Sequence, residues 1–329
     1  MPKQDASPVG GKEKYNNPRS RERSRVLGYI SAKCARPLQV EPPPSAAGGI
    51  LTTKRWGFLV PPGRDAYHLN LDNISSWEYN SYRKSHLSWM FIDEVMRLLF
   101  DNMPPGFFVE AGAFDGEFNS NTLDLERLRG WEGLLVEADE DLFSRLKKKN
   151  RKAWTSNTCF ATSPYPHHTT LVKFTNHQNA KEGSALSKRG FNALIGSNDL
   201  QERMQHGFPV YQPVQCLPLT TLLLAMNVNH VNLISLDVEG GEMDILTTFF
   251  SSQVSLTVDV WVVEHKHPKA KLGTDIVDPD FIYWFQSKGY TLYTFSSVYT
   301  PKDYVFIRNG SSIYDKALLS RPSKFVKKF

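Results

Sequence analysis

Apolar runs alternate with segments of helical spacing along most of the chain. Residues 231–236 form a short, mostly apolar run, which is typical of a strand buried on both faces of a parallel sheet. Residues 85–102 carry apolar side chains at intervals of three and four, which predicts a helix before the first strand. The alternation predicts an α/β fold with a mostly parallel sheet and helices on both faces.

The other elements follow from the same patterns. We expect strands within 107–116 and 131–139 and at 153–161, 171–174, 210–216, 256–264, 290–295 and 304–308, and helices at 119–130, 141–150, 220–227, 242–250 and 281–288. Pro213 interrupts one strand, so we place that strand at a sheet edge. The last two strands are joined by a short loop and should be antiparallel neighbours. His167 and His168 are expected in a turn.

The first 66 residues differ in composition from residues 67–329, which we expect to form the folded domain. Residues 1–56 hold eleven Lys and Arg against four Asp and Glu, whereas the whole chain has a net charge of +5. This Pro-rich, basic tail is predicted to be disordered, with contact to anionic lipid or RNA as the alternative. The remainder sums to −2, which argues against a nucleic-acid partner.

No stretch near the start is long and apolar enough to predict a transmembrane segment. Lys54, Arg55 and two prolines interrupt the longest candidate. On this sequence we therefore expect a cytoplasmic protein.

Two apolar runs far apart in the chain stop abruptly in acidic residues and glycine. The first ends at Glu110 and Gly112, and the second at Asp237 and Glu239. Ligands of open α/β sheets bind beyond the carboxyl ends of the strands, so both ends are candidate site positions. A further run ends at Glu137, where an acidic residue can accept hydrogen bonds from ribose hydroxyls.

The glycine turn after the first strand differs from a dinucleotide site. It contains Gly112 and Gly116 but lacks the third glycine that accommodates a pyrophosphate. Glu110 and Asp115 would repel phosphate and instead suit a neutral or cationic ligand such as S-adenosylmethionine.

At residues 109–116, 135–138 and above all 236–242 the chain resembles the FkbM-type S-adenosylmethionine-dependent methyltransferases. The last segment matches the family's Asp-x-Glu-Gly-x-Glu signature with Asp237, Glu239 and Glu242. The resemblance covers about residues 85–308. It implies a class I methyltransferase-like Rossmann sheet with a closing antiparallel hairpin.

Within that family, residues 137–139, 157–159, 214–219 and 235–240 resemble most closely the Star-like animal proteins. That subgroup implies an alternative: a non-enzymatic protein of vesicle-mediated transport in growth-factor signalling, with a membrane-protein cargo. Its location would be the ER and Golgi or endosomes. In such a lumenal relative Cys159 and Cys216 could form a disulfide.

The family resemblance also implies roles for the site residues. Glu110 would hold the methionine amino group, Glu137 the ribose and Asp237 the sulfonium end, while Ala161 would lie by the adenine. The full expected cofactor set is Glu110, Gly112, Ala113, Asp115, Gly116, Asn121, Glu137, Ala138, Ala161 and Asp237.

The expected reaction is methyl transfer to a hydroxyl of a small molecule or glycan. Asp237, Glu239 or His265 could remove the hydroxyl proton, and position in the family favours Asp237. The alternative for Asp237 is a cap on the Gly240–Gly241 turn. His265 and His267 do not complete a ligand set, so we expect no metal.

Residues 176–207 form a long polar insertion between the two halves of the expected site. Such insertions are uncommon in compact domains unless they cover or bind a ligand. We expect either a cover on the acceptor side or a surface loop.

Overall fold

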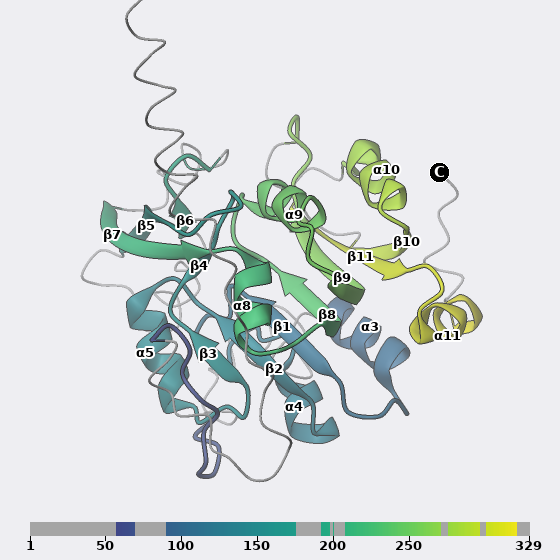
Figure 1. Ribbon diagram of the computed structural model, residues 1–329, viewed down its shortest axis with the longest axis horizontal. Coiled ribbons are helices and arrows are strands. Elements are labelled where there is room, and N and C mark those ends of the chain that lie inside the picture. The colour runs from purple at the N-terminus through teal and green to yellow at the C-terminus, as the bar shows by residue number, and fades with distance from the viewer. Residues whose placement is uncertain are drawn as a thin grey trace, which may run out of the picture. The chain divides into compact units, whose positions relative to one another are not determined.

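The computed structural model describes residues 57–69, 90–175, 192–197, 200, 208–270, 276–296 and 301–320 (Figure 1). The predictions for the tail before residue 57 and for most of the insertion at 176–207 lie outside the described residues. In the described part of the chain, every helix is too short or too polar to span a bilayer.

A seven-stranded sheet forms the centre of the domain, in the order β10-β11-β9-β8-β1-β2-β3 (Figure 1). Its strands are β1 (Phe107–Ala111), β2 (Glu132–Val136), β3 (Trp154–Ser156), β8 (His230–Leu236), β9 (Thr257–His265), β10 (Tyr290–Phe295) and β11 (Lys302–Arg308). β3, β2, β1, β8 and β9 pair in parallel, whereas β11 pairs antiparallel with both β9 and β10. The expected class I methyltransferase-like sheet with a closing hairpin is confirmed.

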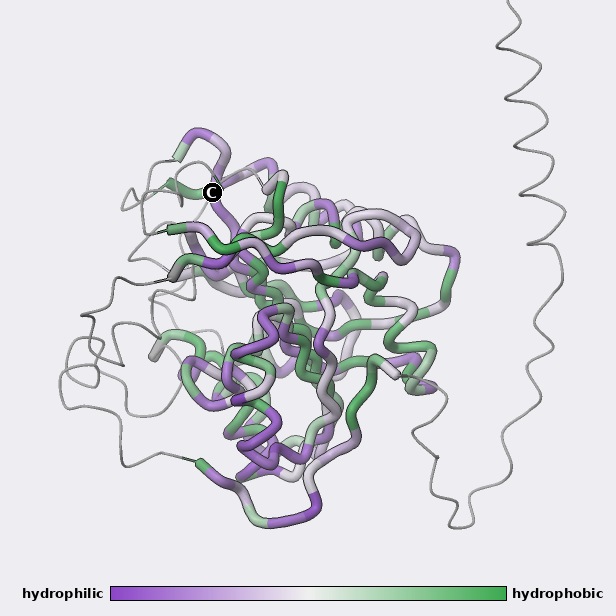
Figure 2. The backbone as a smooth tube through the Cα atoms, turned by 90° about the vertical axis from the view of Figure 1, so that its left-hand side faces the viewer, coloured by the Kyte–Doolittle hydropathy of each residue, from purple (hydrophilic) through white to green (hydrophobic). Residues whose placement is uncertain are grey.

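Helices cover both faces of this sheet. They are α3 (Met90–Phe100), α4 (Leu123–Arg129), α5 (Glu140–Lys148), α8 (Leu219–Ala225), α9 (Glu242–Phe250), α10 (Pro279–Ser287) and α11 (Ser312–Ser320). Successive residues of β1 serve the two faces: Phe108 packs in the cluster of α3, α4, α5 and α11, and Val109 in that of α8, α9 and α10. Figure 2 shows hydrophobic residues concentrated along the central strands.

A second, four-stranded sheet has the order β4-β7-β5-β6. It consists of β4 (Cys159–Phe160), β5 (His167–Thr175), β6 (Ala193–Leu194) and β7 (Phe208–Leu217). The single strand predicted at 153–161 is therefore wrong, since β3 ends at Ser156 and the chain enters the other sheet at Cys159. His167 and His168 begin β5 and do not form a turn.

Pro213 lies on β7, which is an inner strand of the small sheet and not an edge strand as predicted. β4 pairs with β7 only at Cys216 and Leu217, so β7 has one strand neighbour, β5, at Pro213. Proline has no N–H to donate. It is tolerated at this position because only one side of β7 is paired with another strand here.

Cys159 and Cys216 are register partners on β4 and β7 and are joined by a disulfide, with their Cα atoms 4.3 Å apart. Both are buried, at 6% and 0% exposure. The bridge fixes the short strand β4, which has two residues, to the ten-residue strand β7.

Two segment ends differ from their predictions. α8 begins at Leu219, one residue before the predicted helix at 220–227; its N-cap is Pro218, whose carbonyl accepts from the Thr221 N–H. Before Tyr67, Leu59 is buried in the core, and Val60 exchanges backbone hydrogen bonds with Thr155 of β3. We therefore place the start of the folded domain ahead of Tyr67.

Candidate functional site

A cavity of about 380 Å³ lies at the carboxyl ends of the parallel strands. Four neighbouring strands each bring one carboxyl group to its wall: Glu110 on β1, Glu137 just after β2, Asp237 just after β8, and Glu264 on β9. Apolar side chains complete the wall, among them Phe114, Leu142, Phe160, Leu171, Leu194 and Ile245. The topology thus collects residues more than 150 positions apart into one site.

Gly112, just after β1, lies close to the backbone of Asp237, just after β8. Its φ is +78°, and a Cβ atom added there would lie 1.9 Å from the Asp237 carbonyl oxygen. The Gly112 and Ala113 N–H groups both donate to the Val136 carbonyl at the end of β2. Only glycine fits this position, because side chains rarely adopt that φ and no space remains for one.

Glu110 is 3% exposed and organises the chain that leads into α4. Its carboxylate accepts from the Asn121 N–H at 2.7 Å, from Ser120 Oγ at 2.9 Å and from the Thr122 hydroxyl. Burial raises the pKa of Glu110, and the nearby Arg151 charge opposes that rise. Glu110 therefore shapes the cavity wall as well as lining it.

Arg151 supports the same segment from behind. Its guanidinium is buried, pairs with Glu126 at 3.0 Å and donates to the Gly116 carbonyl and to Ser120 Oγ. Lys149 is also buried and pairs with Glu117. Sequence analysis did not identify either cation as a support of the site.

Glu137 is held by two backbone donors. Its oxygens accept from the Phe114 N–H at 2.8 Å and the Asp139 N–H at 2.7 Å. Burial raises the pKa of Glu137 to about 8, despite those hydrogen bonds. Each carboxylate oxygen can accept a further bond, so the side chain remains able to bind a diol.

Asn121 is part of the cavity wall. Its Nδ2 donates to Ser235 Oγ at 3.0 Å, whereas its buried Oδ1 has no hydrogen-bond partner among the described residues. A buried acceptor without a partner is costly, so this oxygen suits a donor on a ligand.

The expected cofactor set is brought together in part. Six of its members line the cavity: Glu110, Gly112, Asn121, Glu137, Ala138 and Asp237. Ala113, Asp115, Gly116 and Ala161 are outside the lining that the described residues form. Asp115 accepts from the N–H groups of Glu117 and Phe118 and so builds the turn. Ala161 follows β4, and Thr158, Cys159 and Phe160 line the cavity in its place.

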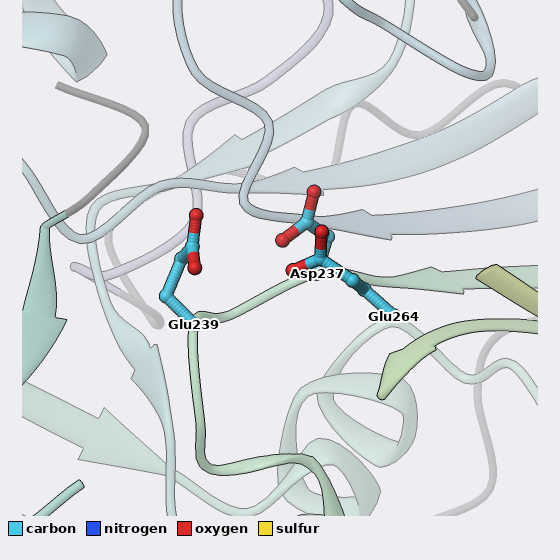
Figure 3. Close-up of side chains that lie close together, drawn as sticks. All are labelled: Asp237, Glu239 and Glu264. Atoms are coloured by element: carbon cyan, nitrogen blue, oxygen red, sulfur yellow. The ribbon is translucent and has the colours of Figure 1, made fainter. Parts of the chain in front are cut away.

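Asp237, Glu239 and Glu264 form an acidic cluster, with one oxygen of each within 4.8 Å of the others (Figure 3). The pKa of Glu264 is raised well above the usual range by burial and by the negative charges of Asp237, Glu239 and Asp303. Three acidic groups alone do not define a metal site, and we assign no metal to them.

Sequence analysis missed Glu264. Its signal was present, because the β-branched run of β9 also ends in a carboxylate, as the runs before Glu137 and Asp237 do. His265, the neighbouring residue, was proposed instead.

His265 does not reach the cavity. Its Nε2 lies 2.9 Å from Asp278 Oδ2, and its ring stacks on Phe281 with centroids 3.9 Å apart. Successive strand residues point to opposite faces, so Glu264 and His265 cannot both face the site. Burial raises the pKa of Asp278, but hydrogen bonds led by that from His265 outweigh it, and the net pKa is lowered.

Glu242 holds the turn after Asp237. Its carboxylate accepts from the Val238 and Gly240 N–H groups, and Glu239 between them has a left-handed φ of +63°. Burial raises the pKa of Glu242 to about 7. The turn is therefore capped by Glu242, and Asp237 is left to line the cavity.

The aromatic side chains near the glycine turn leave the cavity open. Phe114 and Phe118 pack together with centroids 5.6 Å apart and line the wall. From the insertion, Asn192 and Leu194 also line the cavity, and Asn192 Nδ2 donates to Asp139 at 2.8 Å. This part of the insertion contributes to the site.

The comparisons with known proteins give one family. The model of the methyltransferase FkbM domain matches residues 110–292, which is more than half of the chain. No curated protein matches the sequence. Among solved structures, M. capricolum TrmK in complex with S-adenosyl-homocysteine is similar at 8% identity over 68% of this chain and 70% of that chain, with a TM-score of 0.31.

Proposed function

The chain belongs to the FkbM methyltransferase family, and from that premise we propose that it transfers the methyl group of S-adenosylmethionine to a hydroxyl of a small molecule or glycan. The observation that carries the proposal is the single cavity in which Glu110, Glu137 and Asp237 meet. Its volume of about 380 Å³ lies within the range of small-molecule sites.

The lining residues fit the parts of S-adenosylmethionine. Leu142 and Phe160 offer an apolar wall for the adenine, and Glu137 offers acceptors for the ribose hydroxyls. The Asn121 Oδ1 atom can accept from the methionine ammonium. Asp237 places a negative charge at the opposite end, which suits a sulfonium.

S-adenosylmethionine supplies a methyl group made electrophilic by positively charged sulfur. The protein's task is to align the acceptor and exclude water. We assign Asp237 as the base that takes the hydroxyl proton as the new O–C bond forms. Asp237→Asn should keep cofactor binding and stop turnover once an acceptor is known; turnover at the parental rate would refute that role.

Calorimetric titration of S-adenosylmethionine and S-adenosylhomocysteine into the full chain tests the proposal. Glu137→Ala removes the diol acceptor and should weaken binding by about 100-fold or more. It also leaves the Phe114 and Asp139 N–H groups without their acceptor and should lower the thermal unfolding midpoint, so the titration is made at a temperature at which the variant is folded. Glu132→Ala, at the exposed first position of β2, is the control for loss of a carboxylate elsewhere. Unchanged affinity in Glu137→Ala would remove that residue from the site.

A Star-like trafficking protein is the alternative, and the Cys159–Cys216 disulfide is the observation that favours it. Disulfides persist mainly in oxidising compartments such as the ER lumen, so the bridge favours the ER, Golgi or endosomal location over the cytoplasm. Binding of neither ligand by well-folded protein would support this alternative.

A further inference from the structure

Two carboxyl groups lie against each other at the acceptor end of the cavity. β8 and β9 are parallel neighbours, and the pairing of Leu236 with Val263 brings Asp237 and Glu264 side by side. One carboxyl oxygen of Asp237 lies within 4.8 Å of one of Glu264. Two carboxyl groups that share a site disfavour double ionisation, so one proton is retained between them.

Further acidic groups of the described residues lie near this pair. Glu239 lies in the turn after Asp237, and Asp303 of β11 is the register partner of Glu264. The Asp237 charge also raises the pKa of Glu242, at the start of α9. These negative groups oppose the loss of the shared proton.

Two cationic side chains on the neighbouring strands are engaged elsewhere. Lys302 is fully buried, donates to the Ser296 carbonyl and lies over the Phe295 ring. His265 is hydrogen-bonded to Asp278. A positive charge that enters the cavity would therefore change the electrostatic balance of the pair substantially.

We propose that Asp237 and Glu264 share one proton and release it when a positively charged ligand enters the cavity, which makes Glu264 a positioning residue for the base. The inference rests on the proposed function, because it takes the sulfonium of S-adenosylmethionine as that charge. S-adenosylhomocysteine lacks the charge and leaves the proton in place.

The release would prepare the pair for its reaction. Asp237 freed of the shared proton can accept the proton of the acceptor hydroxyl. As that O–H bond breaks, the O–C bond forms and the C–S bond breaks. Asp237 and Glu264 then hold one proton again, opposite a neutral product, so protons and charge balance over the step.

Titration calorimetry at pH 7 in phosphate and in Tris measures the proton linkage without any acceptor. The two buffers differ in ionisation enthalpy, so the difference in apparent heat gives the protons released. We expect S-adenosylmethionine to release about 0.5 to 1 proton more than S-adenosylhomocysteine. The ligands share their amino and carboxylate groups, so the difference reports on the sulfonium.

Two variants show whether the pair is the source. Glu264→Gln keeps an amide that can donate to Asp237 but cannot titrate, so the difference between the ligands should fall to near zero. Asp303→Asn removes a nearby charge and keeps the pair, so the difference should persist with its maximum at lower pH. Thermal unfolding of each variant checks that it is folded.

The outcomes separate this inference from the function on which it rests. Binding of neither ligand would refute the proposed function. Binding of both with equal proton release would overturn the proton-sharing pair alone. Saturable binding of Mg²⁺, titrated alone and lost in Glu264→Gln, would also overturn it, because the cluster would then be a cation site.

Discussion

The two ends of the cavity use carboxylates in opposite ways. At the cofactor end, Glu110 and Glu137 are surrounded by donors, including the N–H groups of Asn121, Phe114 and Asp139. At the acceptor end, Asp237 and Glu264 face each other with further acids nearby. The carboxylates of the cofactor end accept hydrogen bonds before a ligand arrives, whereas those of the acceptor end lie against like charges.

The difference separates two requirements of the site. A fixed set of hydrogen bonds preserves the geometry of a binding wall, as expected where a ligand only has to be held. Like charges in contact leave a protonation state that responds to nearby charge, as expected where a proton moves. Substitutions at each end test this division.

The largest effect is expected from Gly112→Ala, which disrupts the cavity wall at the cofactor end. The new Cβ would meet the Asp237 carbonyl oxygen at 1.9 Å, so β1 and β8 must move apart. We expect the free energy of unfolding to fall by about 4 kcal/mol and ligand binding to be lost. Urea denaturation with calorimetric titration measures both.

Gly289→Ala is the matched control. Gly289 has a similar φ of +84° but nothing within 4 Å of an added Cβ. This substitution should lower the free energy of unfolding by about 1 kcal/mol, through backbone strain alone. Equal losses in the two variants would show that conformation, and not the approach of β1 to β8, makes Gly112 necessary.

The ends of these strands could be predicted because each has a recognisable pattern in the local sequence. Glu110, Glu137 and Asp237 all follow apolar runs, and parallel strands place such ends at one edge. His265, one of the proposed bases, lies on Asp278 and Phe281 and outside the cavity lining, because a run ending in two polar residues does not reveal which one faces the site. Glu264 and His265 are successive residues of β9, so their side chains point to opposite faces of the strand.

The small sheet could not be predicted, because its pairing is not local. β4 has two residues, which is too short for a recognisable pattern, and its partner β7 lies beyond the insertion. The cations Arg151 and Lys149 were missed for the same reason. Their partners Glu126 and Glu117 are 25 and 32 residues away and carry no shared motif.

A smaller effect, at the acceptor end, concerns pH. Burial raises the pKa of Glu242 in the folded protein to about 7, from the ordinary value of 4.5. The folded state therefore holds this proton more tightly, and its contribution to stability is full below pH 4.5 and lost as pH rises towards 7. Between those values the free energy of unfolding should decline.

Glu242→Gln should remove about 2 kcal/mol of that decline, as measured by urea denaturation at pH 5 and pH 7.5. Asp237→Asn should reduce the decline as well, because the Asp237 charge raises the Glu242 pKa. Glu132→Gln, at an exposed position of β2, should leave it unchanged. An identical pH slope in parental and Glu242→Gln proteins would contradict the raised pKa.

The smallest effect is expected from Glu239→Gly, and its sign is opposite. Glu239 has a left-handed φ of +63°, which glycine adopts without strain, and its removal takes one like charge from Asp237 and Glu264. We expect a gain in the free energy of unfolding of about 1 kcal/mol. Thermal and urea unfolding measure it.

Asn227→Gly separates the two causes of that gain. Asn227 has a comparable φ of +57° but lies after α8, and it does not line the cavity. Relief of backbone strain alone should give gains that do not change with pH, and a smaller gain in Asn227→Gly because asparagine adopts this φ with less strain than glutamate. A larger gain in Glu239→Gly at pH 8 than at pH 5 would belong to the charge. Only the second result means that the acceptor end keeps a destabilising carboxylate, as expected if that charge serves the reaction and not the fold.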